Sequence, residues 1–168
     1  NFAAMGGDIS NFMSVMAKGL PPFQISYNAP LKVGYKWYDA EKKPVLFPFG
    51  FGLSYTEYAY SGLTVKKEKA PSVSFTVRNS GKRAGTEIAQ VYASLPASAG
   101  EPPERLVGWT RIELAPGESK LVSIPVDQDR LTIFDEHTHG WKLVPGIYTL
   151  KVGGSSRTLP LSRQVNLQ

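Results

Sequence analysis

The chain has 168 residues, with 19 basic and 14 acidic side chains and no cysteine. The lack of cysteine excludes disulfides, cysteine-based metal sites and a cysteine nucleophile. No run of about 20 apolar residues occurs, which excludes a membrane-spanning helix, and an apolar content of 42% argues against global disorder. The net charge of +5 is scattered in small clusters without interleaved aromatics, which favours a solvated surface over a nucleic-acid interface.

The N-terminal residues 1–8 lack the basic region and apolar run of a signal peptide, and the chain has no initiator methionine. We therefore expect the chain to be the later part of a longer precursor. The absence of a signal peptide from this chain then says nothing about secretion, and a secreted or periplasmic location is a separate expectation.

Residues 1–55 are dense in glycine, proline and aromatic side chains and show little periodicity. One helix is predicted over residues 9–18, and Gly19 would end it. The stretches 34–39 and 44–51 are too short to build a core of their own. The pattern therefore predicts an irregular tail that packs on something else.

From residue 56 onward, short apolar-alternating runs are separated by turn residues. The expected strands are 72–79, 87–94, 106–114, 120–126, 131–134, 141–144, 147–152 and 157–165. Pro116 and Gly117 suit the two central positions of a type II turn. Short strands with a turn every 8 to 12 residues or so are typical of an immunoglobulin-like antiparallel β-sandwich. The lack of amphipathic helices between the strands disfavours a parallel α/β fold.

Two sets of motifs are more specific than the strand pattern. The first set comprises Gly-Tyr-Lys-Trp-Tyr-Asp at 34–39 and Leu-Phe-Pro-Phe-Gly-Phe-Gly-Leu-Ser-Tyr-Thr at 46–56. The second comprises Gly-Thr-Glu-Ile-Ala-Gln-Val-Tyr at 85–92, Pro-Pro at 102–103, Leu-Val-Gly-Trp at 106–109 and Leu-Ala-Pro-Gly-Glu-Ser at 114–119. In this order, over about residues 31–155, they closely resemble the C-terminal region of glycoside hydrolase family 3, in particular its β-glucosidases.

The resemblance implies a division of the chain into two parts. Residues 1–55 would be the tail and linker of a preceding α/β-sandwich domain, and residues 56–168 a fibronectin type III-like domain. The expected fold is therefore all-β, an immunoglobulin/fibronectin type III-like antiparallel β-sandwich. Its irregular N-terminal tail would belong to the adjoining α/β domain.

The resemblance also implies a function. Family 3 β-glucosidases hydrolyse terminal β-D-glucosyl residues from oligosaccharides with retention, and retaining hydrolysis needs two carboxylates beside the scissile bond. The nucleophilic Asp would lie in an upstream barrel and the acid/base Glu in the α/β sandwich, so no catalytic residue is expected in this chain. The expected partners are that upstream portion, an oligosaccharide bound by the whole enzyme, and a second copy in a homodimer. No cofactor, metal, nucleic acid or membrane is expected.

Two other functions remain open. The chain could be a carbohydrate-binding module that uses exposed aromatic side chains, or a structural adhesion β-sandwich without catalysis. The tail argues for the enzyme part, because a free-standing module has no use for a docking segment at residues 30–55.

The aromatic and glycine residues of the Leu46–Thr56 motif are the candidate domain-docking residues. Phe47, Phe49 and Tyr55 would anchor the linker on a partner domain. Gly50 and Gly52 between them suggest a positive φ or a close approach of the backbone to another surface. We expect residues 1–55 to make most of their apolar contacts outside the sandwich.

The central strand at 87–94 raises a separate expectation. Gln90 and Tyr92 are predicted to face inward, and a buried glutamine needs hydrogen-bond partners. Gln90 would therefore brace a neighbouring loop.

Four other aromatic residues are considered for sugar stacking. Trp37 and Tyr38 in the tail are the candidate substrate-binding residues, because they would lie near the catalytic portion. Trp109 and Trp141 fall within expected strands, and core packing is favoured for both.

Three weaker alternatives concern polar residues. Asp39 and Glu41 have the residue type of catalytic carboxylates, but they sit in a turn with an exposed pattern. His137 and His139 could face a metal from one side of a strand, although a polar loop is favoured. The sequence Gly-Gly-Ser-Ser at 153–156 is read as a strand-end turn and not a phosphate loop, since it lacks the following lysine and helix.

Overall fold

A computed structural model describes residues 14, 17–18, 31–67 and 71–168 of the chain. The helix predicted over residues 9–18 falls mostly outside the described residues and stays a prediction. Residues 31–168 form one compact unit. Within it, residues 31–56 precede the first strand and are called the leading segment here.

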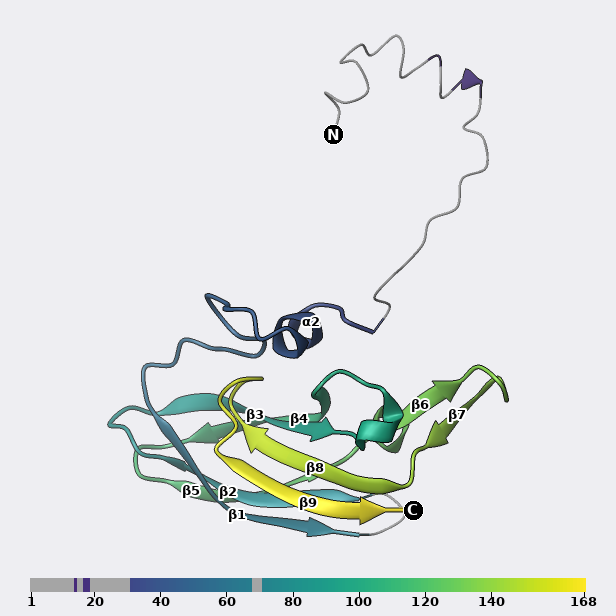
Figure 1. The fold of residues 1–168 in the computed structure, drawn as a ribbon. Helices are drawn as coiled ribbons and strands as arrows, with labels where there is room; N and C mark the ends of the chain where they lie inside the picture. The colour runs from purple at the N-terminus through teal and green to yellow at the C-terminus, as the bar shows by residue number, and fades with distance from the viewer. Residues whose placement is uncertain (1–13, 15–16, 19–30, 68–70) are drawn as a thin grey trace. The chain divides into compact units, whose positions relative to one another are not determined.

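The elements are mostly strands (Figure 1). The strands are β1 (Tyr58–Lys66), β2 (Ser72–Asn79), β3 (Gly85–Ser94), β4 (Arg105–Leu114), β5 (Ser119–Pro125), β6 (Thr132–Asp135), β7 (Gly140–Leu143), β8 (Gly146–Gly153) and β9 (Leu161–Leu167). The helical elements are α2 (Tyr35–Ala40) and the 3-10 turns η2 (Ala97–Ala99) and η3 (Gln128–Leu131). Among the described residues, no helix has the length and apolar character needed to cross a membrane.

The strands form two layers and a separate hairpin. One sheet has the order β1-β2-β5 and the other the order β4-β3-β8-β9, while β6 and β7 pair with each other. Every pairing is antiparallel. The expected antiparallel β-sandwich is therefore confirmed.

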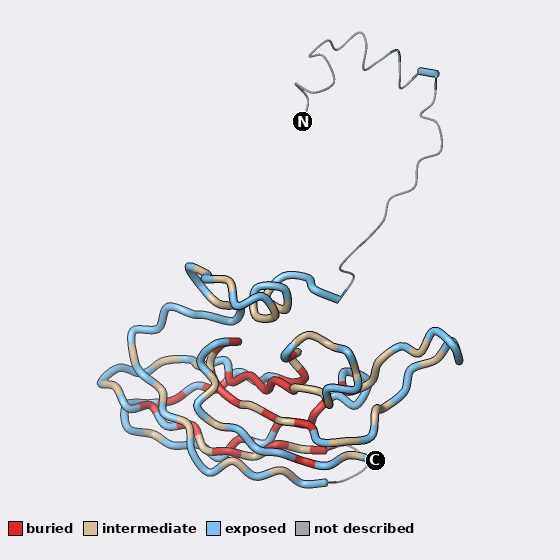
Figure 2. Tube along the Cα trace, viewed as in Figure 1, coloured by how far each residue is buried: buried red, intermediate tan, exposed pale blue. Residues whose placement is uncertain are grey.

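The core lies between the two sheets, and the buried segments in Figure 2 are spread over several strands of the sandwich. On β2, Val73, Phe75 and Val77 are fully buried, as their alternation predicts. Tyr148 and Leu150 of β8 face them from the opposite sheet as part of the same cluster. Burial of such apolar side chains contributes about 1.5–3 kcal/mol each relative to exposure.

The turn at Pro116-Gly117 has the expected geometry. Gly117 has a φ of 75°, and the amide of Glu118 donates to the carbonyl of Ala115 at 3.0 Å. A positive φ at the third turn position defines a type II turn and favours glycine there.

Two strand assignments differ from the prediction. The sequence pattern misses β1, because a bulge between Ser61 and Thr64, where Gly62 has a φ of 69°, shifts the phase of alternation partway along the strand. The last strand begins at Leu161 and not at Arg157, because residues 155–158 close a tight turn through a bridge between Ser155 and Thr158.

Candidate functional site

Residues 89–93 of strand β3 are buried on both faces of the strand. Ala89, Val91 and Ala93 face the sandwich core. Gln90 and Tyr92 point to the opposite face of the sheet, and they too are buried. The prediction that both are buried is confirmed, but their inward orientation is wrong, since the leading segment and not the core covers them.

Gln90 joins three parts of the chain. Its side-chain amide donates to the carbonyls of Gly50 at 3.1 Å and Gly154 at 2.7 Å, and its oxygen accepts from the Tyr92 hydroxyl at 2.7 Å. Burial raises the pKa of Tyr92, so this hydroxyl remains a donor at neutral pH. The expected role of Gln90 as a brace is confirmed by these contacts.

The two candidate glycines differ in their surroundings. Gly50 has a φ of 81°, and a Cβ atom there would lie 2.2 Å from the Gln90 side-chain oxygen. Only glycine meets both conditions without strain. Gly52 has no such constraint, because a Cβ atom there would have open space around it.

Tyr35 of α2 anchors the leading segment on the same face. Its ring stacks on Phe49 with a centroid distance of 4.8 Å and meets Tyr92 edge-on at 5.9 Å. Its hydroxyl accepts a hydrogen bond from the Leu106 amide at 2.8 Å. Burial raises the pKa of Tyr35, so the ring and the neutral hydroxyl both favour the docked position.

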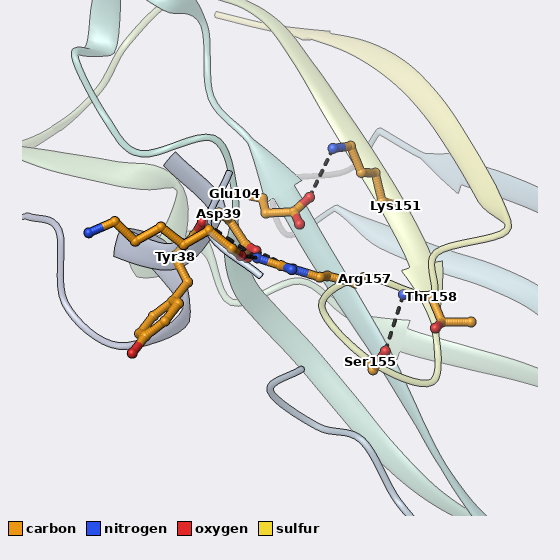
Figure 3. Close-up of polar contacts among 8 residues, drawn as sticks. Tyr38, Asp39, Glu104, Lys151, Ser155, Arg157 and Thr158 are labelled. Atoms are coloured by element: carbon orange, nitrogen blue, oxygen red, sulfur yellow. Dashed lines mark hydrogen bonds and ion pairs between the residues drawn. The ribbon is translucent and has the colours of Figure 1, made fainter. Parts of the chain in front are cut away.

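Arg157 binds the end of α2 from the loop after β8 (Figure 3). Its Nε donates to the Asp39 carboxylate at 2.9 Å. Its Nη2 donates to the carbonyls of Lys43 at 2.7 Å and Tyr38 at 3.4 Å. The guanidinium therefore joins a segment that lies 118 residues away in the sequence.

A second ion pair lies beside the first (Figure 3). Lys151 of β8 donates to the nearly buried carboxylate of Glu104 at 2.8 Å. Together with Asp39, Lys42 and Arg157, the pair lines a polar hollow of about 340 Å³. Each carboxylate is paired with a cation at 2.8–2.9 Å, which offsets part of the cost of placing the charges at a partly buried position.

A larger groove of about 780 Å³ runs between residues 50–60, the start of β3 and the loop 154–160. Inside it, the Tyr60 hydroxyl donates to the Glu87 carboxylate at 2.5 Å. Burial raises the pKa of Glu87. The groove thus combines an apolar lining with one carboxyl group that holds its proton more tightly than usual.

Several side chains of the Leu46–Thr56 motif are strongly exposed, whereas the Thr56 hydroxyl at its end donates to Asn79 of β2 at 2.6 Å. Phe47 and Phe51 pack on each other with a centroid distance of 5.3 Å. Leu46, Leu53 and Tyr55 are 95%, 89% and 91% exposed. Phe49 and Gly50 thus contact the sandwich, whereas Phe47 and Tyr55 leave most of their surface uncovered. We call Leu46, Phe47, Phe51, Leu53 and Tyr55 the apolar run.

The structure separates the four aromatic residues considered for sugar contact. Trp37 and Tyr38 lie on α2, pack edge to face at 5.2 Å and remain partly exposed. The assignment of Trp109 and Trp141 to the core is wrong, since they are 54% and 71% exposed. Their strands present them on the solvent side, where Trp141 meets Phe134 at 5.6 Å.

The polar alternatives find ordinary partners. Glu41 pairs with Lys43 at 3.3 Å, and that contact lowers the pKa of Glu41. His137 and His139 lie in the turn between β6 and β7, where the His137 amide donates to Asp135 at 3.0 Å. Within residues 31–67 and 71–168, no three His, Asp or Glu side chains are arranged to hold a metal ion.

Sequence reasoning missed the polar contacts that fasten the leading segment. Arg157 was placed in a strand, and neither the Glu104–Lys151 pair nor the Tyr60–Glu87 contact has a sequence signature. The one usable signal is the Gly-Gly-Ser-Ser turn at 153–156, which indicates that the residue after it lies at the end of the sheet.

The architecture defines a class of protein. Residues 87–156 match the family of fibronectin type III-like domains, in agreement with the two-layer antiparallel sandwich. The chain therefore contains a fibronectin type III-like domain, preceded by a segment fastened to the outer face of its larger sheet.

Comparison with curated proteins gives a more particular similarity. Probable β-glucosidase K of Emericella nidulans is 39% identical over 82% of this chain, which corresponds to 16% of that protein. Thermostable β-glucosidase B of Acetivibrio thermocellus is 35% identical over 86% of this chain and 20% of that protein. The chain thus spans about a fifth or less of the length of these relatives.

Solved structures give the same answer. DesR, a β-glucosidase from Streptomyces venezuelae solved with D-glucose, has a TM-score of 0.81 and 42% identity over 84% of this chain and 19% of its own. The family 3 β-glucosidase of Bifidobacterium adolescentis has a TM-score of 0.77 and 35% identity, over 80% of this chain and 20% of its own. The resemblance to the β-glucosidases of glycoside hydrolase family 3 is confirmed.

Proposed function

We propose that this chain is the C-terminal part of a retaining family 3 β-glucosidase, which stabilises and orients the catalytic domains. The reaction of the whole enzyme is the hydrolysis of terminal β-D-glucosyl residues from oligosaccharides. The β-glucosidase relatives support this reaction, and DesR with D-glucose supports a glucosyl substrate.

The apolar run is the observation that carries the proposal. Leu46, Leu53 and Tyr55 are almost fully exposed, although the backbone between them is fastened by Gln90. An exposed patch of large apolar side chains is the usual mark of an interaction surface. About four-fifths of the length of thermostable β-glucosidase B lies outside the part that this chain covers, and the corresponding portion is the proposed partner.

A graft tests the proposal. Residues 31–168 would replace the matching region of DesR, and turnover of an aryl β-glucoside would be measured. We expect the chimera to retain activity, DesR without the region to lose it, and the present chain alone to show none, because the carboxylate pair lies elsewhere. A chimera that folds cooperatively but is inactive, or a deletion with full activity, would contradict the proposal.

A second candidate function is carbohydrate binding, which the exposure of Trp109 and Trp141 favours. Aromatic faces on a surface can stack on sugar rings. Affinity electrophoresis in soluble β-glucan, with Trp141→Ala for comparison, would reveal it as a retardation that the variant lacks. The native mass of the chain would show in the same sample whether it forms a homodimer.

A further inference from the structure

Arg157 holds the leading segment by contacts of two kinds. It forms an ion pair with Asp39 at 2.9 Å, and it donates to the backbone carbonyls of Tyr38 and Lys43. The Lys43 carbonyl lies just beyond the end of α2, and the Tyr38 carbonyl also accepts a hydrogen bond from the Lys43 amide at 2.9 Å. A planar guanidinium can satisfy them and a carboxylate at once, which an ammonium on a flexible stem does less well.

Asp39 depends on this contact. Its side chain is only 11% exposed, and within the described residues Arg157 is its ion-pair partner. The second carboxylate oxygen of Asp39 is buried without a hydrogen-bond partner there. Removing the guanidinium would leave a mostly buried carboxylate without compensation, which strongly disfavours the docked position of α2.

The loop that carries Arg157 is itself fixed and holds a second point of the segment. The Thr158 amide donates to the Ser155 hydroxyl at 3.1 Å, as Figure 3 shows. The buried Ser156 donates its amide to the carbonyl of Phe49 at 2.8 Å. Two consecutive residues of one loop therefore bind α2 and Phe49, which lies between Phe47 and Phe51 of the apolar run.

We infer that Arg157 is a positioning residue that latches the leading segment on the sandwich and so presents the apolar run in a preformed arrangement. The latch itself is a property of this chain, whereas its value for docking rests on the proposed function. A surface ordered in advance loses less conformational freedom when a partner binds. Arg157 thereby strengthens association although it lies outside the apolar run.

Hydrogen exchange on the full chain tests the latch. We expect Arg157→Ala to accelerate exchange of residues 35–43 by roughly tenfold or more, since charge-assisted hydrogen bonds are lost. Arg157→Lys should give a smaller acceleration, because lysine keeps a positive charge near Asp39 but lacks the planar guanidinium that also binds the two carbonyls. Exchange in β2 should stay unchanged. The matched control is Arg163→Ala on β9, whose side chain contacts the Leu63 carbonyl and should leave residues 35–43 unaffected.

A double variant separates a specific contact from general loosening. Asp39→Asn should accelerate exchange less than Arg157→Ala, because the carbonyl contacts remain. Asp39→Asn combined with Arg157→Ala should exchange no faster than Arg157→Ala alone, since both changes remove one shared interaction. Three results would overturn the inference. One is unchanged exchange of residues 35–43 in Arg157→Ala, and another is an additive effect of the two changes in the double variant. The third is an equal acceleration of exchange in β2 in Arg157→Ala and Arg157→Lys.

The DesR graft distinguishes this inference from the proposed function. If both hold, residues 47–55 exchange more slowly in the chimera than in the present chain, and Arg157→Ala weakens that protection. A latch effect in the present chain without protection in the chimera would contradict the docking role and leave the latch standing. Protection in the chimera that Arg157→Ala does not change would contradict the contribution of Arg157 to docking.

Discussion

Gln90→Ala should destabilise the protein far more than its single side chain suggests. Gln90 is 3% exposed and serves three partners, namely the carbonyls of Gly50 and Gly154 and the Tyr92 hydroxyl. Alanine removes all three contacts and leaves a space in their place. Gly50 is exposed enough for water to replace its lost partner, whereas Tyr92 is fully buried.

The magnitude follows from the groups left without partners. Each buried polar group that loses its hydrogen bond costs about 1–3 kcal/mol, and two such groups remain after water has reached Gly50. We therefore expect Gln90→Ala to lower the free energy of unfolding by about 3 kcal/mol. Urea denaturation followed by circular dichroism measures this change at constant m-value.

Ile88→Ala is the matched control for this prediction. Ile88 lies on the same strand and the same face as Gln90, and it is 42% exposed. Its truncation should cost less than about 1 kcal/mol, because much of its surface is already in water. A Gln90→Ala effect no larger than that of the control would refute the reasoning that Gln90 fastens the leading segment.

Two further predictions concern residues beside Gln90. Gly50→Ala should lower the unfolding free energy by about 1–2 kcal/mol or more, because a left-handed backbone disfavours a Cβ atom. Gly52→Ala should be nearly neutral. Equal effects of the two substitutions in urea denaturation would contradict this prediction. Burial raises the pKa of Glu87 in the folded state above the ordinary 4.5. The folded state therefore binds this proton more tightly than the unfolded state, which adds stability at low pH. This contribution is lost as the pH rises from 4.5 through the folded pKa. Glu87→Gln should therefore gain stability relative to the natural protein across that window, and a difference between the two that does not change with pH would refute the assignment.

The sandwich could be predicted from the sequence because its signals are local. Alternation in β2 and β8 shows which side chains enter the core, and the Pro116-Gly117 turn specifies its own backbone. A strand whose apolar alternation is interrupted is not predicted, because the alternation is the signal on which the prediction rests. The bulge at Gly62 shifts the phase within β1 and hides that strand.

The candidate site was only partly predictable, since it depends on which face of a sheet is covered. Alternation places Gln90 and Tyr92 opposite Val91, but it does not reveal that the leading segment buries that opposite face. Trp109 is likewise on a strand and nevertheless exposed. The contact between Arg157 and Asp39 joins residues 118 positions apart, and no local pattern reports such a pairing.

The most direct test of the docking role compares the apolar run with an exposed apolar residue elsewhere. Phe47, Leu53 and Tyr55 would be replaced together by serine, both in the present chain and in the DesR chimera. Leu121→Ser on β5 is the control. Leu121 is also strongly exposed, but it lies on the β1-β2-β5 sheet and not on the sheet that the leading segment covers. The measurement is the melting temperature of each protein.

The docking role predicts that the triple variant leaves the melting temperature of the present chain within a few degrees, since these side chains are already in water. The same variant should lower that of the chimera by about 5 °C or more, as expected for the loss of buried apolar contacts, while Leu121→Ser changes neither. An unchanged melting temperature of the chimera would contradict the account, because the apolar run would then contact no catalytic portion.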